Sequence, residues 1–155
     1  MNKQEYQSLL ETILSFYAKD FLSEQNDWCD KDEAACAVVH DEWVKRNAWA
    51  PDNLKVPYAD LPEDEKEKDR DHVRIMKQLR KEMPDADDEA LADRFGSMAH
   101  AKWREGFEGK EGKGAKRMKK TKDGEVNINV PWEELHSDYK RENLEAGRVA
   151  ARVTK

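Results

Sequence analysis

The stretch His40–Arg70 reads HDEWVKRNAWAPDNLKVPYADLPEDEKEKDR, and the same pattern returns later in the chain. The second copy opens at His100 with HAKWREGFEG and closes at Asn143 with VNINVPWEELHSDYKREN. The front halves match at an offset of 60 residues (His40 to His100) and the back halves at 74 (Pro57 to Pro131). The second copy therefore holds an insertion, and an insertion between matching blocks is typical of a duplicated unit.

The matching positions are mainly aromatic, proline and basic residues. The insertion is most simply placed in the loop Gly109–Gly124, since loops accept extra residues more readily than packed elements do. The matched positions are His40 with His100, Trp43 with Trp103, Val56–Tyr58 with Val130–Trp132, Leu61 with Leu135, and Lys66 with Lys140.

The composition is that of a hydrophilic chain with a small core. Of the 155 residues, 40% are charged and 37% hydrophobic, so five Trp, four Tyr and four Phe must supply much of the buried volume. This length suits one compact domain, or two small units that share a core.

The charge and the cysteines exclude several classes of protein. A net charge of −6 argues against a general nucleic-acid coat, because phosphate binding needs a cationic surface. Two cysteines, Cys29 and Cys36, are too few for a disulfide scaffold and indicate a reducing compartment. No apolar run is long enough to span a membrane, and the start MNKQEYQSLLETI is unlike a signal peptide. We expect a soluble, cytoplasmic protein with no membrane partner.

An apolar stripe of helical period marks residues 3–22 and predicts an amphipathic helix. This helix either covers the core or binds a partner, which could be a second copy of the chain. Its apolar residues are Tyr6, Leu9, Leu10, Ile13, Leu14, Tyr17, Phe21 and Leu22.

Three further helices precede the basic loop. The first covers residues 32–47 and begins at Asp30 or Asp32; it places Cys36 and His40 on one face, which we interpret as a buried thiol beside a hydrogen-bonded histidine rather than a metal site. After an extended segment over 47–61, a helix follows Pro62 and ends near 83. The third is capped by Asp85 or Asp87, covers 88–105 and stops at Gly106.

The loop Gly109–Gly124 reads GKEGKGAKRMKKTKDG and is the one strongly cationic segment of an acidic chain. It is expected to be a mobile surface loop, either simply solvated or in contact with an anionic group. Its spacing is not that of a phosphate loop of the GxxxxGK[ST] type. A strand over 126–130 and a helix from 132 or 133 to 152 follow. The candidate phosphate contacts are Lys116, Arg117, Lys119 and Lys120.

The pattern of both copies resembles the ryanodine receptor repeat domain. The resemblance covers about two-thirds of the chain, and the second copy departs from it by having Phe107 where the family usually has Trp and a lysine-rich loop where the family has an acidic one. In the first copy it is carried by His40, Trp43, Trp49, Val56, Pro57, Tyr58, Leu61, Pro62, Lys66, Asp69 and Arg70, and in the second by His100, Trp103, Gly106, Phe107, Val130, Pro131, Trp132, Leu135 and Lys140.

The resemblance implies a fold and a ligand class. It implies pairs of helices with short extended pieces, packed as a pseudo-symmetric tandem, and an adenine-nucleotide site with aromatic residues from both repeats. Bacterial and viral members near nucleotide-signalling defence systems suggest an immune signal as ligand. The function implied is sensing or sequestration without chemistry, in the host cytoplasm if the protein is phage-encoded.

The residues themselves allow such a site. Aromatic rings can stack on a base, and guanidinium or ammonium groups bind phosphate. A pseudo-twofold arrangement could bring the aromatic residues of both copies towards one cleft. The candidate ligand-binding residues are Trp43, Arg46, Trp49, Tyr58, Trp103, Arg104, Phe107 and Trp132.

Two other classes of function stay open. His40 and His100 could act as acid and base in hydrolysis of a bound nucleotide, although no nucleophile motif is present. The lysine-rich loop could bind a protein or a nucleic acid as an adaptor, although the net charge disfavours the latter. We predict a non-catalytic protein without metal or cofactor.

The expected architecture is mainly α: a single compact domain of two pseudo-symmetric helical repeats with short extended segments. We expect an N-terminal helix and turn over residues 1–31, a first repeat over 32–83 and a second over 84–155, with the basic loop at 109–124.

Overall fold

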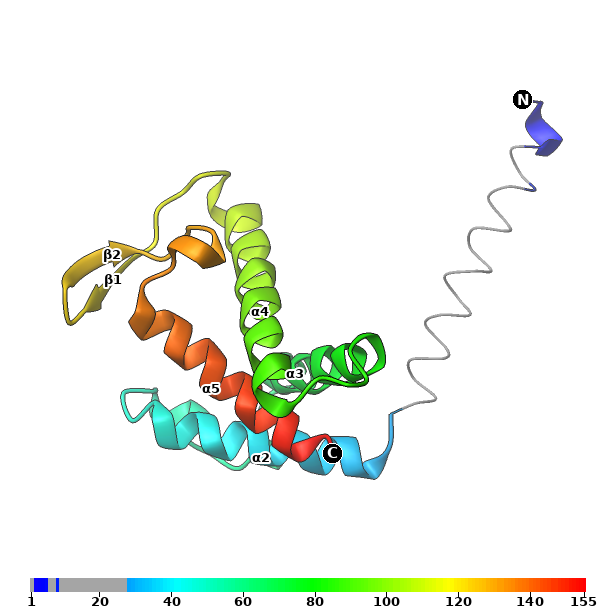
Figure 1. Ribbon diagram of the computed structural model, residues 1–155, viewed down its shortest axis with the longest axis horizontal. Coiled ribbons are helices and arrows are strands. Elements are labelled where there is room, and N and C mark those ends of the chain that lie inside the picture. Colours follow the sequence, from blue (N-terminus) through cyan, green and yellow to red (C-terminus); the bar gives the residue numbers. More distant parts are fainter. Residues whose placement is uncertain (1, 6–7, 9–27) are drawn as a thin grey trace. The chain divides into compact units, whose positions relative to one another are not determined.

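A computed structural model describes residues 2–5, 8 and 28–155 (Figure 1). The chain divides into two units, Met1–Glu33 and Ala34–Lys155. In the first unit, residues 3–5 and 8 are helical, and the rest of the amphipathic helix predicted over 3–22 lies outside the described residues. The second unit contains both copies of the repeated pattern.

The second unit is built mainly from α-helices, as predicted. Each copy runs from a helix through a 3-10 turn to a second helix; the first copy has one further 3-10 turn, and the second copy has a β-hairpin (Figure 1). None of the described helices is long and apolar enough to cross a membrane. The elements are α2 (Asp30–Arg46), η1 (Asp52–Leu54), η2 (Tyr58–Asp60), α3 (Glu63–Glu82), α4 (Asp88–Glu111), β1 (Met118–Thr121), β2 (Gly124–Asn127), η3 (Trp132–Glu134) and α5 (Ser137–Val153).

Helix α4 begins where the sequence predicted and ends later. The Asp87 side chain caps it by accepting a hydrogen bond from the Ala90 amide at 2.8 Å. The prediction that Gly106 stops the helix is wrong, because α4 continues to Glu111 and ends at Gly112, whose φ of 101° favours glycine. The rings of Trp103 and Phe107, one turn apart on α4, stack with their centroids 5.1 Å apart. Gly106 lies between these two residues in the sequence, so their contact supports the additional helical turn.

The beginning of the last helix also differs from the prediction. Residues 132–134 form the turn η3, and α5 starts at Ser137, with His136 accepting a hydrogen bond from the Asp138 amide at 3.1 Å. In the first copy, the segment predicted to be extended contains the turns η1 and η2. In both copies a proline with extended ψ precedes the turn, so the chain is extended only locally.

The basic segment 109–124 is more ordered than a plain loop. It contains the end of α4 and the strand β1, which pairs antiparallel with β2 in the register Lys119 to Val126. The hairpin is tied to its surroundings, because His136 Nε2 lies 2.7 Å from Asp123 Oδ2 and the Lys122 amide donates to Asp138 at 3.2 Å. The expectation of a mobile loop is therefore corrected where β1 forms: this strand reads MKKT, in which apolar and polar residues do not alternate, so the sequence carried no strand pattern there.

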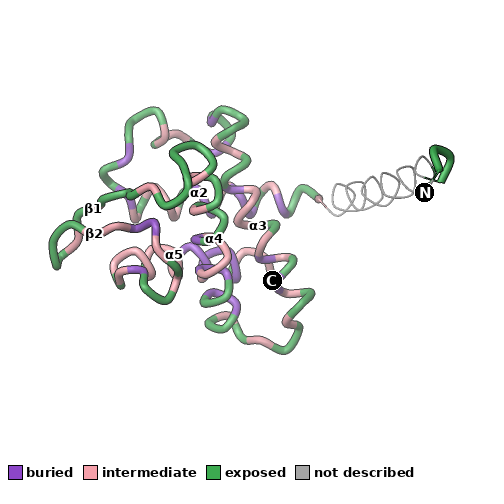
Figure 2. Tube along the Cα trace, turned by 90° about the horizontal axis from the view of Figure 1, so that it is seen from above, coloured by how far each residue is buried: buried purple, intermediate pink, exposed green. Residues whose placement is uncertain are grey.

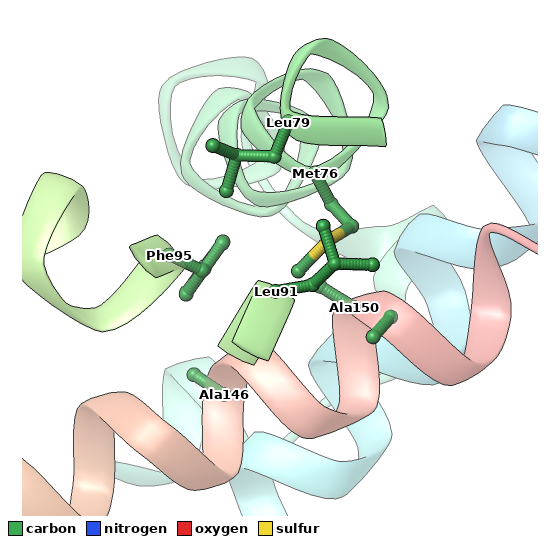
Figure 3. Packing of buried hydrophobic residues seen from close by; sticks show 7 residues of the cluster. Met76, Leu79, Leu91, Phe95, Ala146 and Ala150 are labelled. Atoms are coloured by element: carbon green, nitrogen blue, oxygen red, sulfur yellow. The ribbon is translucent and has the colours of Figure 1, made fainter. Parts of the chain in front are cut away.

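The core lies between α3, α4 and α5. Met76 and Leu79 of α3, Leu91 and Phe95 of α4, and the alanines of α5 point towards one another (Figure 3). Buried segments run along these helices, whereas the hairpin is mostly exposed (Figure 2). Small residues on α5 let it approach α4 closely within the second repeat.

Gly147 lies where α5 packs closely against α4. A Cβ at this position would lie 2.8 Å from the Ala92 carbonyl oxygen and 2.9 Å from its Cα, both backbone atoms of α4. Gly147→Ala is therefore expected to lower the free energy of unfolding by about 1–3 kcal/mol, as overpacking does.

Gly106→Ala is the matched control in the partner helix. A Cβ at Gly106 would meet no described atom within 4 Å, so alanine there should stabilise the protein by about 0.5–1 kcal/mol. Urea denaturation of both variants measures the two changes. Equal effects of the two substitutions would contradict the close helix packing.

Candidate functional site

The two repeats share a histidine anchor. His40 Nε2 lies 2.8 Å from the Val56 carbonyl oxygen, and His100 Nε2 lies 2.7 Å from that of Val130. Because a carbonyl only accepts hydrogen bonds, Nε2 carries the proton in each ring. Each anchor joins the first helix of a repeat to the residue before its proline turn. The prediction of a buried thiol beside a hydrogen-bonded histidine is confirmed, since Cys36 is fully buried and lies one turn before His40 on α2.

Each anchoring histidine also stacks on the tryptophan one turn along its helix. His40 and Trp43 have ring centroids 6.2 Å apart with planes at 20°, and His100 and Trp103 are 5.8 Å apart at 15°. The equivalence predicted from the repeat therefore extends to side-chain geometry. Trp43 and Trp103 therefore occupy equivalent positions in the two repeats.

The aromatic residues of the proline turns are packed against the protein's own side chains. Tyr58 is buried, and the Lys66 ammonium lies 5.6 Å from its ring centroid. Trp132 has Lys140 at the same distance. Its ring also lies against Gly96, where a Cβ would be 2.8 Å from Cη2 of the indole. These two rings were candidates for stacking on a base, and in this structure they serve the packing of each repeat.

The two copies differ in the size of the aromatic residue that follows the proline and of one residue on the first helix. The smaller Tyr58 belongs to the copy that has Cys36, and the larger Trp132 belongs to the copy that has Gly96 at the equivalent position, 60 residues on. A larger ring is accommodated by a smaller residue on the facing helix, which keeps the packed volume similar.

A first cavity of about 220 Å³ opens beside Trp43. It lies between α2, α3 and the turns that join them. Its lining residues are His40, Trp43, Leu54, Leu61, Glu65, Lys68, Asp69 and His72.

A second cavity of about 290 Å³ occupies the equivalent place in the other copy. Six of its residues match the first cavity at the repeat offsets: His100, Trp103, Ile128, Leu135, Tyr139 and Asn143 correspond to His40, Trp43, Leu54, Leu61, Glu65 and Asp69. Its full lining is His72, Ala99, His100, Trp103, Ile128, Leu135, Tyr139 and Asn143. Of the aromatic candidates, only Trp43 and Trp103 line a cavity, one in each, so these rings are not gathered in one cleft.

His72 of α3 lines both cavities. Its Nδ1 atom is enclosed and has no hydrogen-bond partner among the residues that the structure describes. Burial lowers the pKa of His72 to about 4, so the ring is neutral near pH 7. An enclosed imidazole nitrogen without a partner costs free energy, and a ligand or water in either cavity could supply the missing hydrogen bond.

Asp69 carries the main charge inside the first cavity. It is largely buried, and its Oδ2 lies 3.6 Å from His40 Nδ1. Burial raises the pKa of Asp69 to about 6, against the opposing effect of nearby His40. In the second cavity burial lowers the pKa of His100.

The two candidate arginines bind carboxylates or amides of the protein. Arg46 makes a salt bridge with Glu142 at 3.2 Å, which links α2 to α5. Arg104 donates to the Asn129 side chain at 3.1 Å and lies 3.6 Å from Glu108. Neither arginine lines a cavity. Their predicted contact with a ligand phosphate therefore rests only on their nearness in sequence to Trp43 and Trp103.

The remaining candidates lie outside both linings. Trp49 is 74% exposed and meets Trp43 edge to face at 6.3 Å, while Phe107 stacks on Trp103. The Lys120 carbonyl accepts from the Tyr139 hydroxyl at 3.4 Å and the Arg117 carbonyl accepts from the Ile128 amide at 2.9 Å, so β1 lies next to two lining residues of the second cavity. The four basic candidates lie on β1 or just before it, and none of them lines a cavity: Lys116, Arg117, Lys119 and Lys120. Among the described residues, no group of three or more His, Cys, Asp or Glu side chains could hold a metal ion.

Sequence reasoning missed His72, Asn143 and the aliphatic pair Leu54 and Ile128 as cavity residues. Two signals could have found them. Asp69 and His72 lie three residues apart on the face of α3 that also carries the buried Met76. Helical spacing therefore predicts that both side chains face the interior. The offset of 74 residues pairs Asp69 with Asn143 and Leu54 with Ile128.

Comparisons of the chain with protein-family models, with curated proteins and with solved structures found no match.

Proposed function

We propose that the protein binds a nucleotide-derived small molecule without transforming it, and that its role is to sequester that molecule. The observation that carries this proposal is the pair of equivalent cavities, each with a tryptophan stacked on an anchored histidine and both lined by His72. The resemblance to ryanodine receptor repeats, which implies an adenine-nucleotide site, points to the same ligand class.

The size of the cavities fits parts of a nucleotide. Small-molecule sites usually measure about 300–1,000 Å³. Each cavity alone, at about 220 and 290 Å³, lies just below that range. A ligand with two ring systems, one in each cavity, would use both and would meet His72 between them.

The geometry supports binding over hydrolysis. His40 and His100 each use Nε2–H to hold a backbone carbonyl, so neither ring is free to deliver that proton to a ligand. The hydrolase alternative would rely on their Nδ1 atoms alone. The adaptor alternative is favoured by a separate observation, the exposed cations of the β1–β2 hairpin, and would give salt-sensitive binding.

Thermal denaturation against a panel of nucleotides tests the proposal. The panel comprises mononucleotides, cyclic mono- and dinucleotides, ADP-ribose and nicotinamide nucleotides. A ligand at a hundredfold excess over Kd stabilises the folded state by about 2.7 kcal/mol, which for a chain of this size raises Tm by about 5–11 °C. We expect such a shift with at least one member.

The same assay on variants locates the site. Trp43→Ala and Trp103→Ala should reduce the shift, and Met118→Ala, on the exposed hairpin, should leave it unchanged. Circular dichroism establishes that each variant is folded. A panel without any shift, or a shift insensitive to both tryptophans, would refute the proposed site.

A further inference from the structure

The two cavities share one framework but differ in charge. Where the first has Glu65 and Asp69, the second has Tyr139 and Asn143 at the equivalent positions. The first also has Lys68 at its edge, whereas the second is lined by aliphatic, aromatic, phenol, amide and imidazole groups. The lining of the first cavity therefore has two carboxylates and one ammonium group, whereas the second has none of these charged groups.

The Asp69 carboxylate faces no close donor among the described residues that line its cavity. His40 gives its Nε2–H to Val56, so the Nδ1 atom that faces Asp69 at 3.6 Å is an acceptor in the neutral ring. The Lys68 side chain is 70% exposed, and its ammonium lies 2.9 Å from the Glu65 carboxylate. A largely buried carboxylate in this setting is stabilised most by a cation or by N–H donors brought in with a ligand.

We propose that the first cavity binds a planar, positively charged nitrogen ring of a nucleotide, with the ring against Trp43 and its charge opposite Asp69, and that the second cavity takes an uncharged ring. This inference rests on the proposed function and names the ligand class. The shared chemistry is a cationic heterocycle, found in the oxidised nicotinamide ring and in an N1-methylated adenine.

Two attractions act on a cationic ring in the first cavity and are lost for a neutral ring of the same shape. The face of an indole attracts a cation, and more strongly when water is excluded. The Asp69 carboxylate adds a Coulomb attraction, which is stronger in a partly buried site than in water. In the second cavity Asn143 offers hydrogen bonds but no net charge, so ring charge should matter little there.

Matched probe pairs test the inference by isothermal titration calorimetry at pH 7. Nicotinamide mononucleotide is compared with its reduced form, and 1-methyladenosine monophosphate with AMP; within each pair the rings differ mainly in charge. We expect the cationic member to bind about threefold to thirtyfold more tightly in at least one pair. The pair with the larger ratio of affinities indicates whether the cationic ring is a nicotinamide or an N1-methylated adenine.

Variants assign the preference to Asp69. Asp69→Asn gives the first cavity the amide of the second and should abolish the preference, whereas Asn143→Asp should increase it. Asp85→Asn, in the exposed turn between α3 and α4, makes the same change in net charge as Asp69→Asn and should leave the ratio unaltered.

The pH dependence offers an independent check. Besides Asp69, the charged or titratable groups at the cavity are His40, Glu65, Lys68 and His72. Since burial raises the pKa of Asp69 to about 6, the preference for 1-methyladenosine monophosphate over AMP should shrink between pH 7 and pH 5.

The outcomes separate this inference from the proposed function. Equal binding of both members in both pairs, with a Tm shift still sensitive to Trp103→Ala, would overturn the cationic-ring inference and leave nucleotide binding intact. A preference that survives Asp69→Asn would also overturn it. Absence of binding by every nucleotide would overturn both.

Discussion

Phe95→Ala is expected to lower the free energy of unfolding by about 3–5 kcal/mol, the range for removal of a buried phenylalanine. Phe95 has no exposed surface and lies between α3, α4 and α5, among Met76, Leu79 and Leu91 (Figure 3). The facing residues on α5 include alanines, which are too small to move into the space that the ring leaves.

This substitution should also change the cavities. The His72 ring meets Phe95 edge to face at 5.2 Å, and His72 lines both cavities. Loss of Phe95 therefore leaves His72 without its packing partner, so any ligand shift should weaken along with stability.

Urea denaturation measures the first effect, with Phe107→Ala as control. Phe107 is only partly buried, near the end of α4, and its removal should cost much less. A loss below about 1 kcal/mol for Phe95→Ala would show that the three-helix core is not the main source of stability.

Asp69→Asn is expected to stabilise the protein near pH 7, by up to about 3 kcal/mol. Burial raises the pKa of Asp69 from its ordinary value of 3.8 to about 6, and the interval between the two values corresponds to about 3 kcal/mol against the ionised form in the folded state. Asparagine has nearly the same shape and carries no charge, so it removes this penalty.

The sign follows from proton binding. Between about pH 3.8 and pH 6 the folded state holds a proton on Asp69 that the unfolded state has released, so stability falls as pH rises through this window. His72 acts in the opposite direction: burial lowers its pKa from 6.5 to about 4, so its contribution is present above pH 6.5 and is lost as pH falls towards 4.

In the wild type, the pH dependences of stability that arise from Asp69 and from His72 therefore offset one another between pH 4 and pH 6. In Asp69→Asn only the His72 effect remains, so the variant should lose stability on acidification more steeply than the wild type does. The advantage of the variant should be largest above about pH 6 and vanish near pH 3.8. Denaturation curves across this range measure the difference, with Asp85→Asn as the control for net charge.

A variant less stable than the wild type at pH 7 would contradict the buried-carboxylate argument. It would mean that the ionised Asp69 is held by a stabilising contact with His40, closer than the 3.6 Å seen here. The same experiment on Asn143→Asp should show the reverse change, since it introduces a carboxylate at the equivalent point of the second repeat.

Local sequence patterns predicted most of the helices, because periodicity and caps act over a few residues. The apolar spacing of α3 and the Asp87 cap of α4 are examples. The same local logic failed at Gly106, where a glycine that is a poor helix former is kept helical by neighbouring side chains. It also failed at β1, whose short strand is stabilised by pairing with β2.

The repeated pattern of residues was enough to predict a tandem of two helical units. The duplicated histidine, tryptophan and proline-turn residues each form contacts within one repeat, so matching residues produced matching geometry at His40 and His100. Which aromatic rings face a cavity could not be read from that pattern, because burial depends on what packs opposite. Gly96 admits Trp132 against α4, whereas Trp49 stays 74% exposed. The place of His72 between both cavities likewise depends on how two repeats, distant in sequence, pack through α3, α4 and α5.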